Sequence, residues 1–97
     1  MLTGKQKRFL RAKAHHLKPI FQVGKGGVNE NMIKQIVDAL EARELIKVSV
    51  LQNCEDDRNV VAEQLAAGAS AELVQTIGNT IVLYKESKEN KQIILPK

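Results

Sequence analysis

The segment Gly24-Lys25-Gly26-Gly27 combines residue types that suit the binding of a phosphate group. Glycine has no side chain, so its backbone adopts angles closed to other residues and lets a phosphate approach closely. Asn29 follows as a suitable N-cap residue, and the first turn of a helix offers free N–H groups and the positive end of its dipole. Lys25 adds a mobile cation. This segment, named the glycine loop below, is a candidate anion site, although a tight strand-to-helix turn would explain the same pattern.

Cationic side chains gather in the first third of the chain. The 97 residues carry 15 basic and 11 acidic side chains, a formal net charge of +4. Residues 1–29 contain seven of the basic residues and no acid: Lys5, Lys7, Arg8, Arg11, Lys13, Lys18 and Lys25. A charge bias of this kind indicates a polyanionic partner such as a nucleic acid.

Helical spacing sorts the first residues into two faces. At about 100° per residue, Leu10, Ala14 and Leu17 form an apolar stripe that can face a core. Lys7, Arg8, Arg11, His15 and Lys18 fall on another face. Because aromatic residues make up only 3% of the chain, we expect contacts to phosphates rather than stacking of bases on aromatic rings. The predicted RNA-binding residues are Lys5, Lys7, Arg8, Arg11, His15, Lys18, Gly24, Lys25, Gly26, Gly27 and Asn29.

The sequence gives little support for a nucleotide-binding motif, a metal site or a reactive cysteine. The glycine loop lacks the spacing of a dinucleotide-binding fingerprint or a Walker A motif. His15 and His16 are adjacent, so on a helix they point about 100° apart and cannot share a metal as an i,i+4 pair does. Cys54 is the single cysteine and precedes the acidic run 55–57, which disfavours a reactive thiolate. We therefore expect no catalytic residue, metal site or cofactor.

Two alternative functions remain open at this point. One is a small RNA-cleaving enzyme that uses Lys25, His15 or His16, but no general base has a marked partner. The other is a protein-interaction domain whose cationic face meets an acidic protein. No apolar run is long enough to span a membrane, and no secretory signal is recognisable, so we expect a cytoplasmic protein. We also expect it to be monomeric and to have no small-molecule substrate.

The elements that must position these residues follow one another as α-β-α-β-α-β-β. A capping box of Thr3 and Gln6 predicts a first helix to about Leu17. The further predictions are a strand over 19–23, a helix from Asn29 to about Arg43, a strand over 45–51, a helix from Asp56 or Asp57 to a C-cap at Gly68, and a hairpin of strands over 73–77 and 80–84. Helical crossovers make the early strands parallel, and the hairpin adds an antiparallel strand. This order predicts an α/β fold, a two-layer sandwich with a four-stranded mixed sheet.

The chain is expected to form a single domain over residues 1–97, because its length suits one core. Residues 85–97 are predicted to be a polar C-terminal tail. Within this tail, Ile93-Ile94-Leu95 could form a short edge strand or stay loose.

Four motifs follow one another along the chain. They are Leu2-Thr3-Gly4-Lys5-Gln6-Lys7-Arg8 with Leu10, His15-His16-Leu17-Lys18-Pro19, Gly24-Lys25-Gly26-Gly27-Val28, and Gly78-Asn79-Thr80-Ile81-Val82-Leu83-Tyr84. In this order they resemble the YhbY family of stand-alone bacterial CRM domains, named for chloroplast RNA splicing and ribosome maturation. The resemblance covers roughly residues 2–85, and Lys85 stands where the family usually has arginine.

The resemblance implies a fold similar to the C-terminal domain of initiation factor three. It also implies RNA binding through the glycine loop and the neighbouring basic surface, as in other modules that clamp an RNA backbone with a G-x-x-G loop. The implied partner is ribosomal RNA or a precursor of the large ribosomal subunit, whose assembly the protein would assist.

Overall fold

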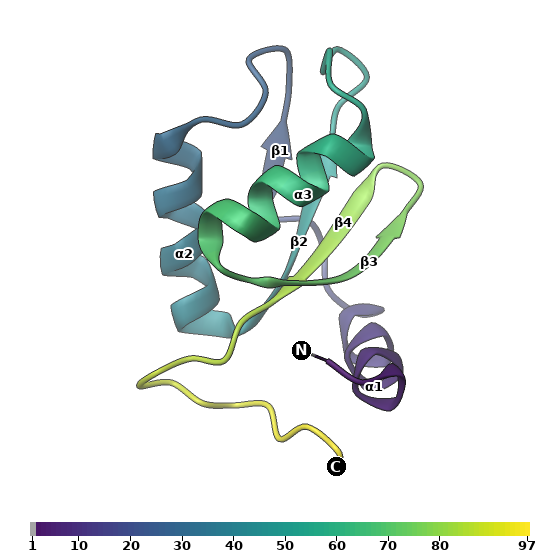
Figure 1. Ribbon diagram of the computed structural model, residues 1–97, viewed down its shortest axis with the longest axis vertical. Helices are drawn as coiled ribbons and strands as arrows, with labels where there is room; N and C mark the ends of the chain where they lie inside the picture. Colours follow the sequence, from purple (N-terminus) through teal and green to yellow (C-terminus); the bar gives the residue numbers. More distant parts are fainter. Residues whose placement is uncertain (1) are drawn as a thin grey trace.

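Four strands form one mixed sheet in the order β1-β2-β4-β3, and three helices pack on it (Figure 1). The computed structural model describes residues 2–97. β1 pairs parallel with β2, while β4 is antiparallel to both of its neighbours, β2 and β3. The predicted α-β-α-β-α-β-β order and mixed sheet are confirmed. The elements are α1 (Gly4–Ala14), β1 (Phe21–Val23), α2 (Glu30–Arg43), β2 (Leu45–Val50), α3 (Arg58–Ala69), β3 (Glu72–Ile77) and β4 (Thr80–Tyr84).

Residues outside the helices fix where α1 and α2 begin. Thr3 and Gln6 form the predicted capping box, in which each side chain accepts a hydrogen bond from the other residue's backbone amide, at 3.1 and 3.0 Å. The Asn29 side chain accepts a hydrogen bond of 2.9 Å from the amide of Met32 and caps α2. The N-caps expected at Thr3 and Asn29 are thus confirmed. The third, expected at Asp56 or Asp57, lies at Asp57, but its side chain makes no capping hydrogen bond.

Two predicted helix ends are wrong. The first helix was expected to reach about Leu17 but ends at Ala14, and Leu17 is exposed. The chain leaves the helix in a turn, where the Leu17 amide donates a 2.9 Å hydrogen bond to the Ala14 carbonyl and the Lys47 ammonium group donates one to the Leu17 carbonyl. Gly68 does not cap α3, which continues to Ala69 and ends at Ser70 in the left-handed conformation. Gly68 instead allows close helix packing, because a Cβ atom there would lie 2.7 Å from Cδ1 of Ile33.

The two faces of the sheet carry separate apolar clusters. The larger one lies under α2 and α3 and includes the residues that were predicted to share a face of the second strand, Ile46, Val48 and Val50. On the other face, α1 packs through Leu10 and Ala14 onto a smaller cluster: Leu45, Val74, Val82 and Tyr84. The expected two-layer sandwich thus describes the sheet with α2 and α3, and α1 adds a partial layer on the opposite face.

A β-bulge in β3 shapes the face on which α1 lies. Leu73 pairs with Leu83 and Gln75 pairs with Val82, so Val74 is the extra residue between them. Val74 belongs to the α1 cluster, and Gln75 borders a groove on the same face. Two successive side chains therefore lie on one side, which the alternation of a regular strand does not allow.

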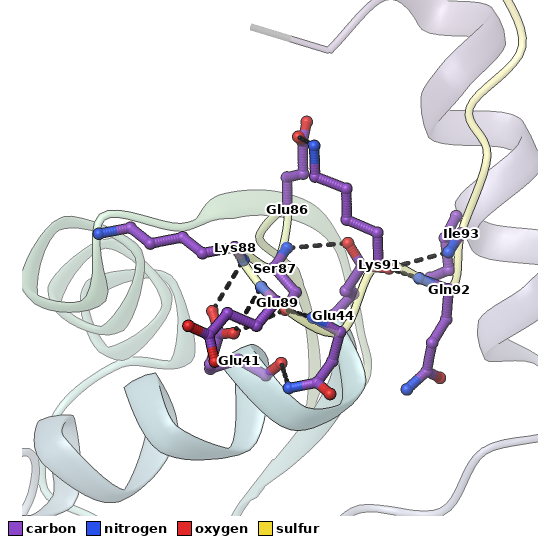
Figure 2. Close-up of polar contacts among 10 residues, drawn as sticks. Glu41, Glu44, Glu86, Ser87, Lys88, Glu89, Lys91, Gln92 and Ile93 are labelled. Atoms are coloured by element: carbon purple, nitrogen blue, oxygen red, sulfur yellow. Dashed lines mark hydrogen bonds and ion pairs between the residues drawn. The ribbon is translucent and has the colours of Figure 1, made fainter.

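Residues 85–97 form neither helix nor strand, but they are held against the domain. Glu41 and Glu44, at the end of α2, accept hydrogen bonds from backbone amides of residues 87–93 (Figure 2). Further along, Ile93 and Leu95 pack against the α1 cluster, and the Gln6 side-chain amide donates a 3.0 Å hydrogen bond to the Pro96 carbonyl. The segment Ile93-Ile94-Leu95 is thus no strand. Ile93 and Leu95 are packed against the domain, whereas Ile94 is 88% exposed.

Candidate nucleic-acid interface

Helix α1 presents the cationic face expected from its sequence. Its buried side chains are Leu10 and Ala14, which turn toward the sheet. The predicted RNA-contacting residues of α1 and the segment after it are exposed, apart from the half-buried Lys7: Lys5, Arg8, Arg11, His15 and Lys18. Because the helix packs on the sheet through its apolar side, these groups remain available to a partner in solvent.

A groove runs between α1 and the sheet. It has a volume of about 580 Å³ and is open to solvent on one side. Arg11, Ala12, Ala14 and His15 line it from α1; β2, β3 and β4 contribute Lys47, Gln75, Ile77, Thr80 and Val82. Three of the lining residues are an arginine, a histidine and a lysine, and none is acidic. The groove thus extends the cationic surface of α1 onto the strands.

The glycine loop turns directly after β1. The amide of Gly27 donates a 3.0 Å hydrogen bond to the Gly24 carbonyl, and Gly27 has a φ of +67°, which favours glycine. Lys25 and Gly26 are exposed, and a Cβ atom at Gly26 would meet nothing within 4 Å. In residues 2–97 the amides of Lys25 and Gly26 have no hydrogen-bond acceptor, so both can receive an anion.

Acidic groups limit the sides from which an anion can approach this loop. A Cβ atom at Gly27 would lie 3.3 Å from Oδ2 of Asp56, so the acidic run 55–57 flanks the loop. Glu30 occupies the first turn of α2, and the side-chain oxygen of Asn29 is already bonded to Met32. Both features weaken the attraction that the N-terminus of α2 was expected to supply. The side formed by Lys25 and Gly26 is the one that stays open.

The predicted site residues form two groups rather than one. α1 packs on Leu45, the first residue of β2, whereas Gly24 lies against Leu51, just beyond the end of that strand. At about 3.3 Å per residue, the two positions are roughly 20 Å apart along β2. Figure 1 shows the same separation, with α1 near one end of the sheet and the loop after β1 at the other.

The sequence reasoning missed three residues of the groove. Lys47 had a usable signal, because the alternation of 45–50 places it opposite Ile46 and Val48 on the α1 face. Thr80 had a similar signal, because the alternation of 80–84 places it on the same face as Val82, which belongs to the α1 cluster. Gln75 had none, since the bulge at Val74 changes the face on which the following residues of β3 lie.

Within residues 2–97 no group of three or more His, Cys, Asp or Glu side chains could hold a metal ion. The His15 and His16 rings meet edge-on with centroids 5.5 Å apart. Over the same residues, every helix is too short or too polar to span a bilayer.

Comparison with known proteins finds relatives along nearly the whole chain. A Bacillus subtilis (strain 168) protein named Probable RNA-binding protein YqeI is 83% identical over 96 residues, which cover 99% of this chain and all of the relative. A Haemophilus influenzae protein named RNA-binding protein is 40% identical over 99% of this chain and 96% of its own length. A candidate RNA-binding protein from Staphylococcus aureus, with a solution structure, superposes with a TM-score of 0.82 at 67% identity, covering 99% of this chain and all of that one.

The family assignment rests on the sequence match together with the fold. The CRS1 / YhbY (CRM) domain matches residues 2–85, which include every helix and strand up to the end of β4. This protein therefore belongs to the CRS1 / YhbY (CRM) domain family.

Proposed function

We propose that this protein binds ribosomal RNA, or a precursor of the large ribosomal subunit, and assists assembly of that subunit without catalysing a reaction. The observation that carries the proposal is the exposed cationic face of α1, which continues into a groove lined by no acid. Such a surface supplies phosphate contacts, the main source of affinity for nucleic acids. The names of the relatives support RNA as the polyanion, and the CRM family assignment supports the ribosomal role.

In this proposal the residues of α1 and the glycine loop contact the RNA backbone at two separate places. Arg8 and Arg11 bind phosphates at the first place. Lys25 and the open amides of the loop bind phosphates at the second. The protein acts in the cytoplasm as a monomer, with RNA as its partner and no small-molecule substrate. We expect it to prefer structured RNA with little sequence readout, because the contacts are to phosphates.

The test is a titration of ribosomal RNA fragments over a series of salt concentrations. Affinity should fall steeply with salt, with a logarithmic slope of roughly 0.7–0.9 for each phosphate neutralised. The variant Arg8→Glu/Arg11→Glu should bind weakly and melt like the parent, because both side chains are exposed.

The matched control reverses two exposed lysines elsewhere, Lys34→Glu/Lys88→Glu, which changes the net charge equally. A flat salt response would contradict the proposal. Equal losses in the two double variants would show that net charge alone, rather than the α1 face, governs binding.

A further inference from the structure

The groove beside α1 lies between the two places at which phosphates are proposed to bind. α1 covers the part of the sheet near Leu45, and the strands beyond it present Lys47, Gln75 and Thr80 to the groove. Ile77, near the tip of the β3–β4 hairpin, is 58% exposed at its border. This uncovered part of the sheet offers an RNA strand one path between α1 and the glycine loop.

The chemistry of the groove suits a nucleotide rather than a phosphate alone. Arg11 and His15 on one wall and Lys47 on the strand side can face a phosphate, while Ala12 and Ile77 provide exposed apolar surface. The Gln75 amide and the Thr80 hydroxyl both donate and accept hydrogen bonds, as the edge of a base requires. A planar guanidinium such as that of Arg11 can also stack on a base, which matters in a chain with few aromatic residues.

The Lys47 side chain is already held in place. Its ammonium group donates a 3.0 Å hydrogen bond to the Leu17 carbonyl, in the segment that leads from α1 to β1. A charge fixed in this way loses little conformational freedom when it binds a ligand.

We propose that this groove receives one unpaired nucleotide, a bulged or looped-out base, of the structured RNA that the protein binds. The base enters between α1 and the strands, and the RNA backbone on one side of it continues toward the glycine loop. A paired base would not enter, because its edge is engaged by its partner and duplex RNA is recognised by shape across its minor groove. This inference rests on the proposed RNA binding and adds to it the feature of the RNA that is selected.

The experiment compares two RNA hairpins that differ by one bulged uridine. The parent protein should bind the bulged hairpin about tenfold more tightly, a difference of about 1.4 kcal/mol in binding free energy. Gln75→Glu places a carboxylate in the groove without changing its shape. This variant should lose the preference for the bulge while still binding the paired hairpin through α1 and the glycine loop.

Gln64→Glu is the matched control, with the same change of atoms and charge at an exposed position of α3, on the other side of the sheet. It should keep the preference. If Gln75→Glu lowers the melting temperature, the variant Lys47→Gln is used in its place. Its control is Lys34→Gln. Lys47→Gln should reduce the preference for the bulge, and Lys34→Gln should not.

The outcomes separate the two proposals. Equal affinity of the parent for both hairpins, or a preference that persists in Gln75→Glu or Lys47→Gln, overturns the nucleotide groove and leaves RNA binding intact. Failure of the parent to bind either hairpin or any ribosomal RNA fragment overturns the proposed function itself.

Discussion

The carboxylate of Glu44 accepts a 2.8 Å hydrogen bond from the backbone amide of Ser87, 43 residues further along the chain. Its other oxygen accepts from the amides of Gln92 and Ile93, at 2.6 and 2.8 Å. Glu44 is fully buried and has a φ of +67°, a conformation that side-chain-bearing residues rarely adopt. This buried side chain thus links the end of α2 to the C-terminal segment (Figure 2).

Replacing this carboxylate should destabilise the protein. Glu44→Gln keeps the shape of the side chain but replaces one acceptor oxygen by an amide group that faces backbone N–H donors. We expect the free energy of unfolding to fall by about 2 kcal/mol, as for lost hydrogen bonds to a charged group. Urea denaturation measures this effect, with Glu63→Gln at an exposed position of α3 as control. Equal stability of the two variants would contradict the anchoring role.

The same contacts should make stability fall in acid. Burial raises the pKa of Glu44, but hydrogen bonds from the amides of Ser87, Gln92 and Ile93 outweigh it, and the pKa is lowered overall. Hydrogen bonds from the Lys88 amide, the Ser87 hydroxyl and the Glu89 amide lower the pKa of Glu41.

A pKa lowered by folding stabilises the native state above the unfolded pKa, and this stabilisation is lost as the pH falls through the folded value. Stability should therefore decline below about pH 4.3, the ordinary pKa of a glutamate. Urea unfolding over a pH series should show this decline in the parent and a shallower one in Glu41→Gln/Glu44→Gln. Identical slopes would assign the acid sensitivity to other groups.

Two carboxylates in the glycine loop should weaken RNA binding. Lys25→Asp/Gly26→Asp places negative charge on the open side of the loop, so affinity should fall by more than in Lys25→Ala. Gly26 lies outside the positive-φ region and an added Cβ atom there is free of contacts, so we expect little change in melting temperature. Parent-like RNA affinity in the folded double variant would mean that the loop serves only as a turn.

Gly27 and Gly26 should differ in their tolerance of a side chain. Gly27→Ala forces a φ of +67° on alanine and brings its Cβ atom to 3.3 Å from the Asp56 carboxylate. We expect a loss of about 1–2 kcal/mol in the free energy of unfolding. Gly26→Ala, one residue earlier, is the control and should be nearly neutral. Thermal denaturation of both variants checks the difference, and equal melting temperatures would contradict it.

Purified protein should leave labelled RNA intact, with or without magnesium. Neither His15 nor His16 has a carboxylate partner among residues 2–97 that would orient it for acid–base chemistry. Gel analysis after prolonged incubation measures the result. Cleavage that disappears in His15→Ala or His16→Ala would instead identify the protein as a nuclease.

The features that the sequence predicts well are those determined by neighbouring residues. The capping box at Thr3, the N-cap at Asn29 and the alternation around Val48 depend on spacings of two or three residues, and the structure has all of them. The cationic face of α1 follows in the same way from helical periodicity.

Features that depend on contacts between distant residues could not be predicted from the sequence. The sequence predicts a helix cap at Gly68, but the structure shows that Gly68 packs closely against Ile33 of α2. Residues 85–97 look like a loose polar tail because their partners, Glu41 and Glu44, lie more than forty positions earlier. The separation of α1 from the glycine loop also follows only from the way in which the sheet is assembled.

The outer strands of the sheet offer little edge for pairing with a strand of another molecule. β1 has three residues, and β3, at the opposite edge, is interrupted by the bulge at Val74. A strand from another molecule would find a short ladder on one side and an interrupted ladder on the other, which is how natural sheets discourage edge-to-edge aggregation. The sheet can therefore leave part of one face uncovered for a ligand without offering its edges as templates for a fibril.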